Sequence, residues 1–257
     1  MNIKIQWVAY ITMVMVEVRR MIRIWPQALL PSVITSVLYF VIFGRVIGHR
    51  IGQMNGYDYV TFIAPGLIMM NIITSAYGST SSALFSAKMQ HSVEEILVSP
   101  ISHSTMLLGY MSAGIARGFV IGILVLIVSL IFAHIPVHSV LSIFFAALFS
   151  ASIFSLLGVI NAIYAKTFDD VSIIPTFVLT PLTYLGGVFY SIQLLPKFWQ
   201  YVSLINPIVY IIDNFRYGFL GIQHTHIVYS YLCMILFAVI LFGFTFYLLK
   251  KGVGLRS

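Results

Sequence analysis

The sequence carries very little charge. Of 257 residues, 14 are basic and 7 acidic, which makes 8% of the chain against about 25% in a typical soluble protein. Apolar types make up 60%, and the mean hydropathy is +1.00. So few charges cannot cover a soluble fold of this size without leaving large apolar patches exposed. The sequence therefore predicts a protein embedded in a lipid bilayer and excludes a soluble enzyme and a disordered chain.

Cysteine and the common enzyme motifs are also scarce. The single cysteine, Cys233, excludes an intrachain disulfide. The sequence has no Gly-Lys dipeptide and so no phosphate-binding loop, and it has neither a zinc-protease motif nor a nucleophile elbow. We therefore expect no catalytic residue and no metal site, with His134 and His138 in outer loops. The basic residues flank apolar runs, which favours contact with anionic lipid and not with nucleic acid.

Long uncharged runs alternate with charged positions. A helix needs roughly 20 apolar residues to cross about 30 Å of hydrocarbon, and six segments meet this requirement. The proline in His134-Ile-Pro-Val-His138 divides the longest run into two crossings. We predict an all-α membrane protein, a single domain over residues 1–257. Its six transmembrane helices are expected at 26–44, 59–82, 108–133, 140–164, 171–190 and 228–249.

The distribution of lysine and arginine predicts the orientation. An even number of spans places both termini on one side, and cytoplasmic loops carry an excess of basic residues. Cytoplasmic termini satisfy this rule, because they leave more of the basic residues inside than outside. The inner set is Lys4, Arg19, Arg20, Arg23, Lys88, Lys166, Lys250, Lys251 and Arg256, and the outer set is Arg45, Arg50, Lys197 and Arg216.

Two segments outside the spans have helical signals. On a helical wheel, residues 3–25 divide into an apolar and a polar face, with Arg19, Arg20 and Arg23 on the polar face. This pattern predicts an amphipathic helix in the cytoplasmic interface. The helix could anchor the first span or act as a lever against a cytoplasmic partner. Residues 198–212 are too short to cross the bilayer, and they predict an outer re-entrant or interfacial hairpin between spans five and six.

The link between spans two and three contains a short helix signal. Ser92 and Glu95 have the spacing of a capping box, and Pro100 ends the helix near Ser99. An apolar side next to an acidic side is typical of a helix that presses into a groove on another protein. Packing against the chain's own bundle is the alternative. The apolar side consists of Val93, Ile96 and Leu97, and the acidic side of Glu94 and Glu95.

Small residues recur every four positions in spans three and four. This spacing lets helices approach closely, so we expect packing contacts, within or between subunits. Arg117 lies inside span three and is expected to reach the cytoplasmic interface, with the lining of a substrate path as the alternative. Asp169 and Asp170 are expected to cap span five. The small residues are Gly114, Gly118 and Gly122 in span three and Ala147, Ala151 and Ser155 in span four.

Several segments, in this order and over essentially the whole chain, resemble the ABC-2 type permeases, the membrane subunits of bacterial ATP-binding-cassette exporters. An amphipathic helix precedes the first span. The other matching segments are Tyr59-Val-Thr-Phe-Ile-Ala-Pro-Gly-Leu-Ile68, Glu94-Glu-Ile-Leu-Val-Ser-Pro-Ile101, Pro181-Leu-Thr-Tyr-Leu-Gly-Gly-Val-Phe189 and Asn206-Pro-Ile-Val-Tyr210, which runs on to Gly221.

The resemblance implies a homodimer, or a close equivalent, in the bacterial inner membrane. Two separately encoded ATP-binding subunits would bind ATP and magnesium, and this chain would hold no cofactor. Residues 92–99 would form the coupling helix against the ATPase, residues 3–25 the connecting helix beside it, and residues 192–221 the outer hairpin that helps to close the path.

The same resemblance implies that spans one and five face the partner permease and line the substrate path. Both spans are apolar and aromatic and contain no charge, which favours an amphipathic or lipid-linked substrate. The expected lining residues are Tyr39, Phe43, Phe177, Tyr184, Gly186, Gly187, Phe189 and Tyr190.

Two other functions fit the sequence less well. A stand-alone secondary transporter with two three-helix repeats would explain why spans two and five are both interrupted by proline. No acidic residue lies inside any span to bind a coupling ion, however, and no internal repeat is visible. An intramembrane enzyme that acts on lipids would need a catalytic cluster that the sequence lacks.

Overall fold

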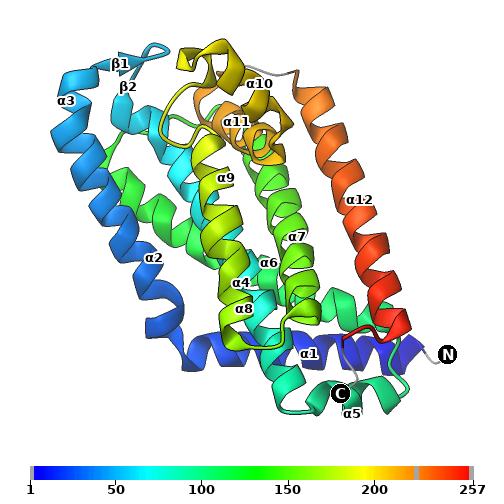
Figure 1. Cartoon of the computed structure of the whole chain (residues 1–257). Helices are drawn as coiled ribbons and strands as arrows, with labels where there is room; N and C mark the ends of the chain where they lie inside the picture. The colour runs from blue at the N-terminus through cyan, green and yellow to red at the C-terminus, as the bar shows by residue number, and fades with distance from the viewer. Residues whose placement is uncertain (1–2, 223–225, 255–257) are drawn as a thin grey trace.

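The computed structural model describes residues 3–222 and 226–254, and these residues are almost entirely helical (Figure 1). Arg256, counted above among the inner basic residues, lies outside the described residues. The elements of the first half are α1 (Ile3–Arg23), α2 (Trp25–Tyr39), η1 (Phe40–Ile47), α3 (Gly48–Ile51), β1 (Gln53–Met54), β2 (Tyr57–Asp58), α4 (Tyr59–Met89), α5 (Ser92–Val98) and α6 (His103–Phe132). Those of the second half are α7 (Val140–Tyr164), α8 (Phe168–Ile174), η2 (Pro175–Leu179), α9 (Thr180–Leu185), η3 (Ile192–Leu194), α10 (Lys197–Ile205), α11 (Pro207–Leu220) and α12 (Ile227–Lys251).

Five helical segments are long and apolar enough to cross a membrane: Trp25–Gly44, α4, α6, α7 and α12. The prediction of an all-α membrane protein is therefore confirmed. The predicted span 171–190 takes a different form. It consists of α8, η2 and α9, which follow one another over residues 168–185. The middle piece is a π-helix that begins at Pro175, since a proline ring removes a backbone donor and disturbs regular α-helical hydrogen bonding.

Helix α4 is the centre of the bundle and packs against both α6 and α7 (Figure 1). Small residues allow this close approach. A Cβ atom at Gly158 of α7 would collide with Thr80 Oγ1 and the Tyr77 carbonyl oxygen of α4. Thr80 Oγ1 also donates a hydrogen bond of 2.9 Å to the Ser155 carbonyl oxygen, so α4 and α7 are joined by a polar contact as well.

The glycines of α6 face α4 in the same chain. A Cβ atom at Gly114 would collide with Thr80 and Ser155, and one at Gly122 would lie 2.8 Å from the Ile72 side chain. Gly118 lies opposite Ala76 and Ile72. The stripe therefore makes contacts within the subunit, one of the two arrangements that its spacing allows.

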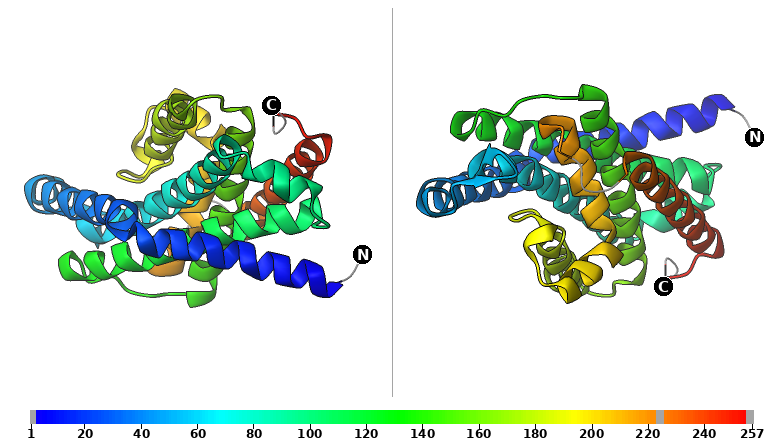
Figure 2. Two further views of the ribbon diagram at one scale, coloured as in Figure 1. Left: turned by 90° about the horizontal axis from the view of Figure 1, so that it is seen from below. Right: turned by 90° about the horizontal axis from the view of Figure 1, so that it is seen from above.

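The two ends of the bundle carry different elements (Figure 1). Helix α1 crosses one end, and α5 and the end of α12 lie at that same end. The short hairpin β1–β2, with α10 and α11, covers the other end, and Figure 2 shows α1 crossing the bundle when it is seen from below. The hairpin was not predicted, although its turn residues Asn55 and Gly56 both have positive φ and an Asn-Gly pair is typical of such turns.

The predicted caps are only partly correct. Thr167 is the N-cap of α8, and it forms a reciprocal capping box with Asp170. Asp170 thus caps this helix as expected, from the third helical position. The predicted capping box of α5 is wrong. His91 is the N-cap residue, in the left-handed conformation and without a side-chain cap, and the Ser92 hydroxyl donates instead to the Ala87 carbonyl oxygen at 3.0 Å.

Replacing Gly158 with alanine tests the close packing of α4 on α7. The added methyl group must displace Thr80 or the backbone at Tyr77, and overpacking of this kind costs about 1–3 kcal/mol. We expect a lower melting temperature in detergent. Gly78→Ala is the matched control, since a Cβ there has nothing within 4 Å and alanine favours a helix. Equal melting of both variants and wild type would contradict the packing role.

Candidate functional site

The end of the bundle that carries α1 and α5 contains the first candidate site. Val93 is only 1% exposed and anchors α5 in the chain's own core, while Val98 is 86% exposed. Glu94 and Glu95 are exposed too, and Leu97 is half-buried. The predicted apolar side of α5 thus packs partly on its own bundle. Glu94, Glu95 and Val98 form the exposed edge of α5, where Glu94 Oε1 lies 3.6 Å from His91 Nδ1.

Gln6 links α1 to the segment between α5 and α6. Its Nε2 donates to the Pro100 carbonyl oxygen at 2.7 Å. Its Oε1 accepts from the Ser102 backbone N–H at 2.9 Å and from the Thr105 hydroxyl at 2.8 Å. A single amide of α1 therefore binds both sides of the turn that follows α5.

The three arginines of α1 have different environments. Arg19 and Arg23 are exposed. Arg20 turns toward the bundle, where it pairs with Glu17 at 3.3 Å and donates to the Ser82 hydroxyl at 3.4 Å. Burial raises the pKa of Glu17, and the nearby Arg20 opposes this shift. Only Arg19 and Arg23 are thus free to contact a lipid surface or a partner, as was expected of all three.

Arg117 approaches the same region from α6. One of its terminal nitrogens, Nη2, donates to the Ala28 carbonyl oxygen of α2 at 3.3 Å. It shares a small cavity with Glu17 and Arg20. Arg117 therefore reaches the corner between α1 and α2 and lies apart from the aromatic residues described next.

The second candidate site is an aromatic cluster formed by α2, η1, α9 and the turn after α9. The hydroxyl oxygens of Tyr39 and Tyr184 lie 3.0 Å apart and form a hydrogen bond. The Phe189 ring packs against Tyr39, Phe43 and Tyr184 with ring centroids 4.8–5.6 Å apart. Four of the predicted lining residues thus meet in one place. Tyr39 and Tyr184, which are in contact, are 145 positions apart in the sequence.

The other predicted lining residues take no part in these ring contacts. Phe177 is 73% exposed on η2 and faces away from the chain. Gly186 and Gly187 are buried in the turn after α9. A Cβ at Gly186 would lie 2.9 Å from Ile208 of α11, and Gly187 has φ +80°. These two glycines therefore shape the turn, and Tyr190 is half-buried beside it.

Side chains at the end of the bundle opposite α1 hold this turn through backbone oxygens. Buried Arg216 donates to the Gly187 carbonyl oxygen at 2.7 Å, and its guanidinium carbon lies 4.1 Å from the centroid of the Phe62 ring. The Tyr59 hydroxyl donates to the Phe189 carbonyl oxygen at 3.0 Å. Arg216, counted above in the outer basic set, is buried in α11 and is a fixed part of the fold. The pair of opposite charges Asp213 and Arg216, three positions apart in a largely apolar helix, was the signal for it.

Long apolar helices, with α1 and α5 gathered at one end, define a multi-pass membrane protein. The chain belongs to the ABC-2 type transporter family, whose model matches residues 8–220. It is 50% identical to the inner membrane transport permease YadH of Escherichia coli (strain K12) over 251 residues, which cover 98% of each chain. It is also 24% identical over 208 residues to nodulation protein J of Rhizobium leguminosarum bv. viciae, which covers 79% of this chain and 80% of that protein.

A second nodulation protein J matches a longer part of the chain than the first one does. Nodulation protein J of Rhizobium meliloti (strain 1021) is 23% identical over 238 residues, 91% of each chain. The resemblance to ABC-2 permeases is therefore confirmed, and the chain is a multi-pass inner membrane protein with the role of a transport permease.

Replacing Gln6 with alanine tests its link to the turn after α5. The Ser102 amide loses its acceptor, and we expect its hydrogen exchange to become faster by about tenfold, the effect of losing roughly 1.4 kcal/mol of local protection. Exchange mass spectrometry of a peptide that covers 99–105 measures this change. Gln27→Ala, at an exposed position of α2, is the control. Unchanged exchange in Gln6→Ala would refute the link.

Proposed function

We propose that this chain is the permease subunit of an ATP-driven exporter that moves an amphipathic or lipid-linked substrate out across the inner membrane. Two copies form the membrane dimer, and two separate ABC ATP-binding subunits bind ATP and magnesium. This chain has no enzymatic activity of its own. Family membership supports the proposal, and one arrangement carries it: α5 is anchored at Val93 and exposes an acidic edge, and Gln6 of α1 binds the turn that follows α5.

The arrangement of α1 and α5 suggests how force enters the bundle. ATP binding closes the ATPase subunits, and their movement displaces the exposed edge of α5. The turn at Pro100 follows α5, and Gln6 carries its displacement to α1, which leads directly into α2. The bundle then shifts between two packed arrangements that open inward or outward.

The proposed topology has six spans with both termini in the cytoplasm. In it α8, η2 and α9 together form the fifth crossing, and α10 and α11 form an outer re-entrant hairpin. Four lysines lie where α4, α7 and α12 end, at the same end of the bundle as α1: Lys88, Lys166, Lys250 and Lys251. Their position agrees with an excess of basic residues on the cytoplasmic side. The exposed face of α1 combines apolar side chains with Arg19 and Arg23, which suits a helix in the membrane interface. Its apolar members are Ile3, Trp7, Val8, Met15 and Ile22.

The proposed substrate path lies between the two permease copies, beside the aromatic cluster. Ile34 and Leu38 of α2 and Phe177 of η2 are exposed, and a second copy would cover these apolar side chains. The cluster offers apolar ring surfaces together with the hydroxyls of Tyr39 and Tyr184. This combination suits a molecule that has both an apolar and a polar part.

Charge reversal on α5 tests the docking of an ATPase. We expect Glu94→Lys combined with Glu95→Lys to abolish co-purification of a cytoplasmic ATPase with the tagged permease and to reduce export at least tenfold. The physical reason is that a like charge replaces an attractive one at a rim contact. Membrane insertion should be normal, since both side chains are exposed. Lys197→Glu, at the opposite end of the molecule, is the control.

Wild-type export by the double variant would refute docking at α5. Uphill transport by the purified chain alone in liposomes, driven only by an ion gradient, would favour the stand-alone secondary transporter instead.

Disulfide crosslinking tests the dimer. In a Cys233→Ser background, a cysteine at Leu38 should crosslink to the second copy under mild oxidation, because this position faces the proposed dimer seam. A cysteine at Leu232 of α12, which is equally exposed, should stay monomeric on a non-reducing gel. The reverse pattern, or no crosslink at Leu38 or Phe177, would contradict the seam along α2 and η2.

A further inference from the structure

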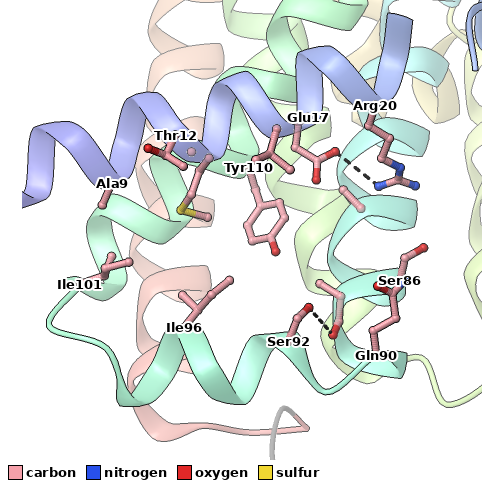
Figure 3. Close-up of a pocket in the computed structure, with 15 residues that line it drawn as sticks. Ala9, Thr12, Glu17, Arg20, Ser86, Gln90, Ser92, Ile96, Ile101 and Tyr110 are labelled. Carbon is pink, nitrogen blue, oxygen red and sulfur yellow. Dashed lines mark hydrogen bonds and ion pairs between the residues drawn. The ribbon is translucent and has the colours of Figure 1, made fainter. Parts of the chain in front are cut away.

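A cavity of about 500 Å³ lies between α1, α4, α5 and α6 (Figure 3). It is within the usual size range of small-molecule sites, roughly 300–1,000 Å³. The cavity separates α1 from α5, and the contacts that link these helices do not fill it. Most of its wall is apolar and comes from Ala9, Met13, Val16, Ala83, Ala87, Ile96 and Ile101.

Two of the polar residues that line the cavity, Tyr110 and Glu17, each have an oxygen without a hydrogen bond to any described residue. Tyr110 is only 5% exposed, and its hydroxyl points into the cavity (Figure 3) with no hydrogen-bond partner among the residues that the structure describes. Glu17 uses one carboxylate oxygen, Oε2, for Arg20. Its Oε1 has no hydrogen bond within the described part of the chain. Both oxygens border the cavity, so a ligand bound there could form hydrogen bonds with them.

The polar groups of the cavity select the head group of that ligand. Glu17 Oε1 can only accept a hydrogen bond when ionised, and a tyrosine hydroxyl can accept as well as donate. Arg20 is already bound to Glu17 and to the Ser82 hydroxyl, and Figure 3 shows its guanidinium on the side of α4. A head group that donates therefore finds acceptors, whereas a carboxylate head would face the carboxylate of Glu17.

We propose that this cavity binds a small amphipathic molecule with an apolar body and a hydrogen-bond-donating head, an ammonium or a hydroxyl. The head lies between Glu17 Oε1 and the Tyr110 hydroxyl, and the body lies against the apolar wall. An occupied cavity keeps α1 and α5 apart. The site does not depend on the proposed export function, since binding can be measured on the permease alone.

Three probes with one body and different heads test the proposal: phenylbutylamine, phenylbutanol and phenylbutyrate. Titration calorimetry uses the full chain in nanodiscs, with empty nanodiscs subtracted to remove partition into lipid. We expect saturable binding of the amine, weaker binding of the alcohol and none of the carboxylate. A charge-assisted hydrogen bond is stronger than a neutral one, which sets this order.

Matched variants locate the binding. Glu17→Gln should weaken binding of the amine by about tenfold or more. Tyr110→Phe should weaken binding of both the amine and the alcohol by about threefold. Glu94→Gln and Tyr10→Phe are the controls, because neither residue lines the cavity. Ala87→Leu fills the cavity and should weaken all binding, with thermal melting used to check that each variant is folded.

Several results would overturn the proposal. One is the absence of saturable amine binding above the empty-nanodisc signal. Another is carboxylate binding as tight as that of the amine. A third is amine binding that Glu17→Gln, Tyr110→Phe and Ala87→Leu all leave unchanged in folded protein.

Discussion

The close approach of α4 to α6 and α7 is the constraint on which the rest of the structure depends. Neither water nor lipid reaches most of α4, so its stability comes from packing and from hydrogen bonds inside the bundle. Gly114 and Gly158 provide the space, and Thr80 lies between them and bonds to the Ser155 carbonyl oxygen. Because this centre is rigid, the elements at both ends have a fixed frame against which they can move.

The two ends are attached to that frame by the same kind of contact. Gln6 binds backbone groups around Pro100 at one end, and Arg216 binds the Gly187 carbonyl oxygen at the other. Asn206 likewise donates to the Leu182 carbonyl oxygen at 2.6 Å. A side chain that binds a backbone oxygen can release it at the cost of one hydrogen bond, about 1 kcal/mol net. Such attachments hold a turn in place and still allow it to move.

Hydropathy predicts the long helices well because the bilayer demands an uninterrupted apolar run. The span 140–164 coincides with α7. Hydropathy misses the parts of a helix that leave the bilayer. Helix α6 begins at His103, five residues before the predicted span, because Ser102 caps it by accepting a hydrogen bond from the Thr105 N–H. The predicted cap at Ser92 is wrong because His91, with its backbone in the left-handed conformation, is already the N-cap residue of α5.

The candidate sites were less predictable than the helices. The aromatic residues of the cluster could be named from their types, but the buried turn position of Gly186 and Gly187 could not, since it depends on the packing of α11. Gln6 and its partners lie 94–99 positions apart in the chain, and no local pattern connects them. The cavity at Tyr110 likewise exists only because four helices meet there.

Two π-helical segments adjoin the aromatic cluster: η1 at Phe40–Ile47, which contributes Phe43, and η2 at Pro175–Leu179. A π-helical turn holds one more residue than an α-helical turn. If such a wide turn migrates by one residue along the helix, the side chain it passes rotates by about 100° around the axis, the angle per residue of an α-helix. Tyr39 directly precedes η1, and Tyr184 follows η2 within one helical turn and a half. These helices can therefore change which aromatic faces meet by local rewinding, without unfolding and without breaking the central packing.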